Sequence, residues 1–145
     1  MLPPPHGRRF GLLIADIDRF KLVNDRYGHA TGDTALRTVA RTLLESSRIV
    51  DDIARFGGEE FALTITDVDE VRLRAIAERF QALVERSRVA TGRVDLGVTV
   101  SIGGASAEVG DTAEVPFERA DAALYRAKEG GRNRVVLAGD DHGGR

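Results

Sequence analysis

Two adjacent glycines, Gly57 and Gly58, lie between two short apolar segments and constrain the fold of this chain more than any other feature. Glycine adopts positive φ without steric cost, so the pair predicts a tight turn. The flanking segments, residues 53–56 and 61–65, then pair as a β-hairpin. Two carboxylates, Glu59 and Glu60, follow the turn directly and would lie at its rim. On these residues alone, solvated glutamates explain the pattern as well as a ligand site does.

The other hydrophobic patterns predict alternating strands and helices. Residues 9–15 form an apolar run typical of a buried strand, and residues 20–27 suit a short helix that stops at Gly28. Strands are also expected at residues 94–102 and 135–137. Three further helices are expected. The first begins near Asp33, capped by Thr31 or Asp33; the second follows a cap at Asp67 or Asp69 and carries Val71, Leu73, Ile76, Ala77, Phe80, Leu83 and Val84; the third spans residues 117–128, with Ala120, Ala123, Leu124 and Ala127 inward.

This order of elements predicts an α/β domain with a mixed central sheet and helices packed on it. A ferredoxin-like arrangement, the palm of many nucleotide cyclases and polymerases, is the simplest solution. The length of 145 residues suits one domain. We expect that domain at residues 10–138, with a flexible N-terminus at residues 1–9 and a flexible tail at residues 139–145.

Composition excludes several classes of function. The chain has no cysteine, which rules out disulfides, thiolate zinc sites and cysteine nucleophiles. Its 23 Asp and Glu residues, against three histidines, favour a hard cation such as Mg²⁺. The net charge of −2 argues against a nucleic-acid partner. No apolar run reaches membrane-spanning length and the start lacks a signal peptide, so a cytoplasmic protein is expected.

Asp16 and Asp18 end the first predicted strand and point to the same side of an extended backbone. Carboxylates placed together repel one another, and a divalent cation relieves that repulsion. Together with Glu59, Asp16 would complete an oxygen cage for Mg²⁺. An ordinary polar turn after a strand is the alternative, and it is the favoured one for these two residues taken alone.

Five blocks of sequence together resemble one family. Residues 55–61 (RFGGEEF) match the GGDEF signature in its Gly-Gly-Glu-Glu-Phe form. Four blocks resemble other parts of the family pattern: residues 16–29 (DIDRFKLVNDRYGH) with Gly32-Asp33, residues 98–103 (VTVSIG), the helix pattern at residues 120–128, and residues 131–135 (GRNRV). The match runs from about Phe10 to Val136. It lacks the Leu-Thr-Gly-Leu and Asn-Arg segment that usually comes first, since residues 1–9 are too few to hold it.

The resemblance implies a diguanylate cyclase that joins two GTP molecules into cyclic di-GMP. In that family pattern Asp16 and Glu59 supply metal carboxylates, and the backbone carbonyl of Ile17 is a further ligand for Mg²⁺, or for Mn²⁺. Glu59 is also the expected base for the attacking 3′-hydroxyl. Glu60 supports the metals or the hairpin, and Lys21 neutralises phosphates.

The resemblance also implies a substrate site. Asn24 and Asp33 would read the guanine edge, because an amide offers a donor and an acceptor and a carboxylate accepts from N–H groups. His29 would lie near the nucleotide, with packing of the short helix end as an equal alternative. Lys128 and Arg132, four residues apart, would face one phosphate ligand. Without the resemblance, these two cations would be interpreted as part of a solvated basic face.

Arg48 and Asp51 precede the Gly-Gly turn at the spacing of the family's RxxD inhibitory site, which binds the product. Arginine can fork onto a phosphate or a guanine edge, while aspartate accepts from the base. Arg79 would add a further product contact, or it is a charge on a helix surface.

Because each site holds one GTP, the implied reaction needs two protomers facing each other, and a homodimer is expected during turnover. The leading alternative is a catalytically impaired module that binds cyclic di-GMP or GTP. A third possibility is an adapter that binds only other proteins. Incubation with GTP and Mg²⁺ separates the first two, and calorimetry with guanine nucleotides identifies the third.

Overall fold

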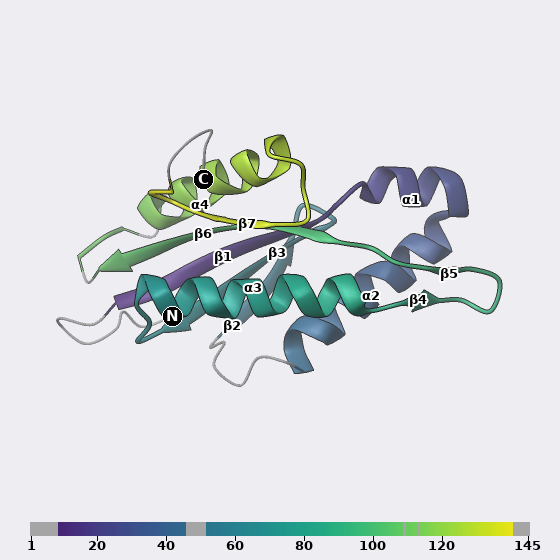
Figure 1. Ribbon diagram of the computed structural model, residues 1–145, viewed down its shortest axis with the longest axis horizontal. Coiled ribbons are helices and arrows are strands. Elements are labelled where there is room, and N and C mark those ends of the chain that lie inside the picture. The colour runs from purple at the N-terminus through teal and green to yellow at the C-terminus, as the bar shows by residue number, and fades with distance from the viewer. Residues whose placement is uncertain (1–8, 46–51, 109, 113, 141–145) are drawn as a thin grey trace.

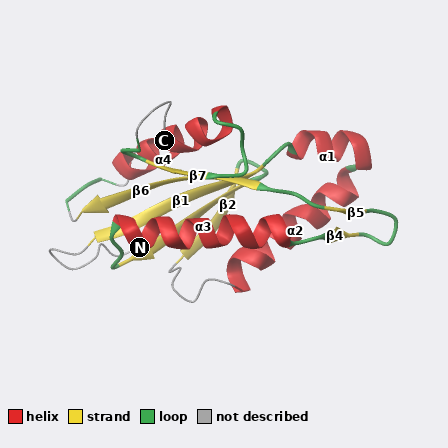
Figure 2. Ribbon diagram, in the orientation of Figure 1, coloured by secondary structure: helices red, strands yellow, loops and turns green. Residues whose placement is uncertain are grey.

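The computed structural model describes residues 9–45, 52–108, 110–112 and 114–140, and all structural statements below concern these residues. The chain alternates strands and helices, as the sequence predicts (Figures 1 and 2). In order, the elements are β1 (Arg9–Ile17), α1 (Phe20–Tyr27), α2 (His29–Glu45), β2 (Asp52–Phe56), β3 (Glu60–Thr66), α3 (Glu70–Arg86), β4 (Val89–Ala90), β5 (Asp95–Leu96), β6 (Val100–Glu108), α4 (Glu114–Glu129) and β7 (Val135–Leu137).

A five-stranded sheet in the order β2-β3-β1-β6-β7 forms the centre of the molecule. The first strand, β1, runs antiparallel to both of its neighbours, β3 and β6, whereas β7 pairs parallel with β6. The hairpin predicted around Gly57 and Gly58 is the β2–β3 pair. The mixed α/β sheet expected from the order of elements is therefore confirmed.

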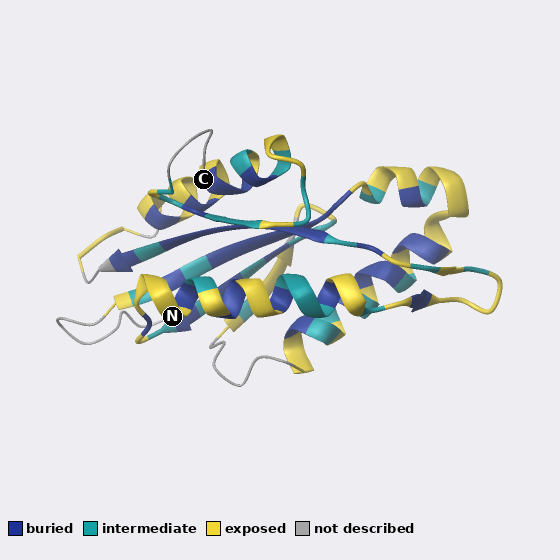
Figure 3. Cartoon of the chain, in the orientation of Figure 1, coloured by how far each residue is buried: buried dark blue, intermediate teal, exposed yellow. Residues whose placement is uncertain are grey.

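Helices cover both faces of this sheet, with α4 on one side and α3 on the other (Figure 1). Neighbouring residues of β1 point to opposite faces, and both faces are buried: Leu13 belongs to the large core cluster, while Ile14 packs with Ala120 and Leu124 of α4. Both side chains are fully buried, and the central strands of the sheet are coloured mostly as buried in Figure 3. Burial on both faces explains why β1 is a continuous apolar run rather than an alternating one.

The contact between α4 and β6 depends on a glycine. A Cβ atom on Gly103 would lie 2.2 Å from the backbone nitrogen of Leu124 and 2.3 Å from the carbonyl oxygen of Ala120. Because these are backbone atoms, they cannot rotate away. The helix therefore lies directly on the strand, which brings the C-terminal end of α4 close to the end of β1.

Several local expectations were wrong. Residues 94–102 do not form one strand: β5 pairs with β4 in a small separate ladder, and β6 begins only at Val100. The second helix begins at His29 rather than near Asp33, because the N–H of Gly32 already bonds to the carbonyl of Gly28. Of the two caps expected for α3, by contrast, Asp69 is confirmed: its carboxylate accepts from the N–H of Arg72 at 2.8 Å. Val71 is 81% exposed and does not join the core.

Candidate functional site

The hairpin turn and the end of β1 meet at one edge of the sheet. Gly57 and Gly58 both have positive φ, 67° and 88°, as the tight turn requires. The N–H of Ile17 donates to the carbonyl oxygen of Glu59 at 3.3 Å, and Asp16 is the register partner of Glu60. These contacts bring Asp16, Glu59 and Glu60 into one acidic group.

Two cations at the end of α4 face this acidic group. Lys128 Nζ forms an ion pair with Asp16 Oδ2, and the side chain of Asp16 is only 4% exposed. The charge of Arg132 also lowers the pKa of Asp16. Arg132 occupies the turn after α4 with φ of 65°, and its N–H bonds to the carbonyl of Ala127. The charges of Lys128 and Arg132 thus both act on Asp16.

The pKa values of all three carboxyls are raised. Burial is the largest cause in each case. The negative charge of Asp16 raises the pKa of Glu59 and of Glu60 further, and Asp18 does the same to Asp16. Lys128 opposes these effects on all three, but burial outweighs it. A site that holds several partly desolvated carboxylates together favours a positively charged ligand.

Asp18 has a different environment from Asp16. Its Oδ1 accepts from the hydroxyl of Ser101 at 2.6 Å, and its Oδ2 accepts from the hydroxyl of Thr99 at 2.6 Å and from the N–H of Asn133 at 3.0 Å. Asp18 therefore ties the end of β1 to the start of β6 and to the turn after α4. Thr99 and Ser101 are two residues apart in extended backbone and so point to the same face, but nothing in the sequence identified Asp18 as their partner.

The oxygen atoms at this edge are the type of ligand that a hard divalent cation takes. Among the described residues, no three His, Asp or Glu side chains are grouped closely enough to hold a metal ion by themselves. The predicted ligands are instead two carboxylates, of Asp16 and Glu59, and one backbone carbonyl. The carboxylate of Glu59 has no hydrogen-bond partner within the described ranges, which leaves its two oxygens available as hard ligands.

The residues expected to bind guanine lie on α1 and α2. Asn24 is half-buried near the end of α1, whereas Lys21, His29 and Asp33 are exposed. The tight connection at Gly28, with φ of 93°, folds α2 back against α1 and brings Asn24 next to Gly32. Asn24 therefore lies at the junction between the two helices, and Asp33 directly follows Gly32 in the chain.

The expected product site is described only in part. Arg48 and Asp51 lie outside the described residues. Arg79 is exposed on α3, on the face turned away from the core. The geometry therefore neither joins these three residues nor separates them.

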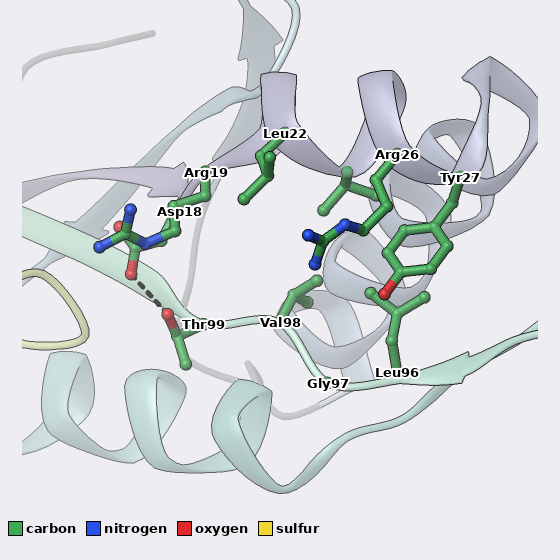
Figure 4. Close-up of a pocket in the computed structure, with 10 residues that line it drawn as sticks. Asp18, Arg19, Leu22, Arg26, Tyr27, Leu96, Gly97, Val98 and Thr99 are labelled. Carbon is green, nitrogen blue, oxygen red and sulfur yellow. Dashed lines mark hydrogen bonds between the residues drawn. The ribbon is translucent and has the colours of Figure 1, made fainter.

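A pocket of about 250 Å³ opens beside the site, between α1 and the segment that leads into β6 (Figure 4). Leu22, Leu96 and Val98 line its apolar part, and the bonded pair Asp18 and Thr99 closes one end. Neither Asn24 nor Asp33 lines it. The sequence did not predict this pocket, because its two walls are about 70 residues apart and only the tertiary fold brings them together.

No helix in the part of the chain that the structure describes combines the length and the apolar character needed to cross a membrane.

Comparison with protein families gives one match over most of the chain. The family described as "Diguanylate cyclase, GGDEF domain" matches residues 4–134. Diguanylate cyclase A of Treponema denticola is 41% identical over 128 residues, which is 88% of this chain and 34% of that protein. The response regulator PleD of Caulobacter vibrioides is 46% identical over 133 residues, which is 90% of this chain and 29% of that protein. The chain thus spans about a third of the length of these curated relatives.

Solved structures show the same architecture. The GGDEF domain of DgcB from Caulobacter crescentus, in complex with c-di-GMP, superposes with a TM-score of 0.87 at 36% identity and covers 92% of this chain and 80% of that one. The active GGEEF domain of a diguanylate cyclase from Vibrio cholerae has a TM-score of 0.82 at 28% identity and covers 92% and 85%. The palm-like fold expected from the sequence is confirmed.

Proposed function

The chain belongs to the diguanylate cyclase GGDEF domain family, and from that premise we propose that it joins two molecules of GTP into cyclic di-GMP and releases two of pyrophosphate. Several similar proteins carry the name diguanylate cyclase, which supports this activity. GTP is the proposed substrate and cyclic di-GMP the proposed product. Since GTP is supplied inside cells, we also propose that the domain acts in the cytoplasm.

The meeting of the hairpin turn with the end of β1 is the observation that carries this proposal. The bond from the N–H of Ile17 to the carbonyl of Glu59 holds Asp16 and Glu59 at one edge. Burial is the main cause of both raised pKa values; the charge of Asp18 raises that of Asp16 further, and the charge of Asp16 raises that of Glu59. A folded protein keeps such an arrangement at a cost in stability, which supports a role in function rather than in folding.

Asp16, Glu59 and the carbonyl of Ile17 would hold Mg²⁺, with Mn²⁺ as an alternative. When bound, the ion supplies charge stabilisation for a triphosphate and polarises its α-phosphate. Glu60, next to Glu59 and register partner of Asp16, would hold the hairpin in place at this site.

Glu59 would accept the proton of the 3′-hydroxyl of one GTP. A carboxylate whose pKa is raised by burial accepts a proton more readily at neutral pH than an ordinary glutamate does. The 3′-oxygen then bonds to the α-phosphorus of the other GTP, the bond to the β-phosphate oxygen breaks, and pyrophosphate leaves. Lys21, Lys128 and Arg132 would balance the charge of the phosphates.

Asn24 and Asp33 would hold the guanine, with His29 close to the nucleotide. One site binds one GTP, so two protomers would face each other with their substrates antiparallel, in a homodimer formed during turnover. Arg48, Asp51 and Arg79 would bind the product and inhibit the enzyme.

Synthesis by the wild-type chain and by Glu59→Gln tests this function. The substitution removes the proton acceptor and one metal charge while keeping the shape of the side chain. We expect cyclic di-GMP from the wild type with GTP and Mg²⁺, and a loss of at least about 100-fold in turnover from the variant. Binding of 3′-deoxy-GTP, which cannot supply the attacking oxygen, checks that the variant is folded. Equal turnover in the two proteins would remove Glu59 from the mechanism.

A further inference from the structure

Gly32 and Asn24 face each other where α1 packs against α2. Gly32 is buried in the first turn of α2, and Asn24 is half-buried near the end of α1. A Cβ atom on Gly32 would lie 1.7 Å from Asn24 Oδ1 and 2.8 Å from its Cγ. Real Cβ atoms essentially never come closer than 3.0 Å to another heavy atom. The amide of Asn24 therefore occupies the space that any larger residue at position 32 would need.

The amide of Asn24 has a defined orientation in this contact. Its Oδ1 is buried and has no hydrogen-bond partner. Its Nδ2 is not among the buried atoms that lack a partner, and no described residue accepts a hydrogen bond from it. Turning the amide over would bury two N–H donors against the CH₂ of Gly32 instead of one acceptor, at greater cost. The oxygen thus faces Gly32, and the NH₂ group is the end of the amide that can still donate to a ligand.

We propose that Gly32 is a positioning residue for the nucleotide site, which lets Asn24 turn its oxygen inward and present Nδ2 as a donor to an acceptor on the purine. The inference rests on the proposed function, since it assigns a role within the same site. The purine acceptors in question are O6 and N3. Asp33, which follows Gly32 and is exposed, carries a carboxylate that only accepts hydrogen bonds. It is therefore the residue that would accept from the N1–H and 2-amino groups of guanine.

The test compares the affinities of 3′-deoxy-GTP and 3′-deoxy-ITP, which lacks the 2-amino group, by calorimetry with Mg²⁺. Gly32→Ala pushes the Asn24 amide out of place. We expect it to weaken both nucleotides by the same factor, at least about tenfold, because both carry O6 and N3. The ratio of GTP to ITP affinity should stay at its wild-type value. Asp33→Asn should instead reduce that ratio.

A double variant separates positioning from a general effect on the helix. In the Asn24→Ala background there is no amide to displace, so adding Gly32→Ala should change neither affinity further. This pair stays informative if Gly32→Ala alone folds poorly, since Asn24→Ala opens the space that a Cβ needs. An undiminished effect of Gly32→Ala in that background overturns the proposal.

Two other results also overturn it. Wild-type affinities in Gly32→Ala would show that the contact does not position Asn24, and a collapse of the GTP-to-ITP ratio would show that Asn24 reads the 2-amino group through its oxygen. The side-chain amide NMR signal of Asn24, recorded without nucleotide, distinguishes failure of the inference from failure of the function. The signal should shift in Gly32→Ala even if the wild type binds no GTP. A shifted signal without GTP binding would refute only the proposed function, whereas an unshifted signal would refute the inference.

Discussion

The ammonium group of Lys128 forms an ion pair with the carboxylate of Asp16, although 112 residues separate them in the chain. The same ammonium group lowers the pKa values of Glu59 and Glu60. One cation at the end of α4 therefore acts on all three carboxyls of the site. The family resemblance implied only a phosphate ligand for Lys128, whereas in the structure Lys128 also has an acidic partner inside the protein.

Lys128→Met should move the acid limb of the pH profile of kcat/KM to higher pH. Without the positive charge the pKa values of Asp16, Glu59 and Glu60 rise further, so the carboxylates take up protons at a pH where those of the wild type are still ionised. Rates of cyclic di-GMP synthesis across a pH series measure the shift. Lys128→Arg keeps the charge and should keep the limb near its original position. Superimposable profiles for Lys128→Met and the wild type would contradict the assigned coupling.

Asp18→Ala should destabilise the fold, whereas Asp16→Asn should not. The first change leaves the hydroxyls of Thr99 and Ser101 and the N–H of Asn133 without their acceptor, at a cost of about 3 kcal/mol. The second removes a charge that burial disfavours, so the loss should stay below about 1 kcal/mol. Denaturant unfolding without metal measures both. Ser101→Ala, which removes one donor, should give a smaller loss than Asp18→Ala; equal stability of Asp18→Ala and the wild type would rule out the anchoring role.

Arg48→Ala should relieve inhibition by the product and leave the initial rate unchanged. Arg48 is proposed to bind cyclic di-GMP through its guanidinium group and has no proposed role in synthesis. Progress curves with added cyclic di-GMP measure the effect, and initial rates without it are the control. If the variant is inhibited as strongly as the wild type, the inhibitory site lies elsewhere.

Asp140→Asn should lower stability near neutral pH but not in acid. Burial alone would raise the pKa of Asp140, but the hydrogen bonds from Arg74 and from the N–H of Leu137, with the charge of Arg74, lower it below its usual 3.8. A lowered pKa means that the folded state favours the carboxylate, so the stabilisation is full above the unfolded pKa and is lost as pH falls through the folded one.

The expected loss for Asp140→Asn is about 1 kcal/mol or less at about pH 7, since the side chains of Asp140 and Arg74 are 29% and 38% exposed and water screens the pair. Unfolding in urea at about pH 7 and about pH 3 measures the difference. Arg74→Met should cost a similar amount, and combining it with Asp140→Asn should add little. A loss that persists unchanged in acid would contradict the ionic origin of this contact.

Local patterns in the sequence predicted the elements that depend on neighbours a few residues apart. Gly57 and Gly58 predicted the hairpin, Gly28 predicted the end of α1, and the spacing of Ala120, Ala123, Leu124 and Ala127 predicted the buried face of α4; all are confirmed. The strand predicted at residues 94–102 was wrong because a local pattern does not determine which strands pair. Apolar and polar residues do alternate there, but strand pairing depends on distant partners, which divide the segment between two ladders.

The sequence by itself determined the α/β fold class, the order of the elements and the residue types that meet at the site, because these depend on periodicity, turn residues and the recurring blocks. Only the tertiary structure decided the partners. In the folded protein Asp18 accepts hydrogen bonds from Thr99, Ser101 and Asn133, Asp16 forms an ion pair with Lys128, and Asn24 contacts Gly32. Such contacts depend on how β1, β6, α4 and the α1–α2 junction pack in space. No local pattern in the sequence predicts which donor pairs with which buried carboxylate.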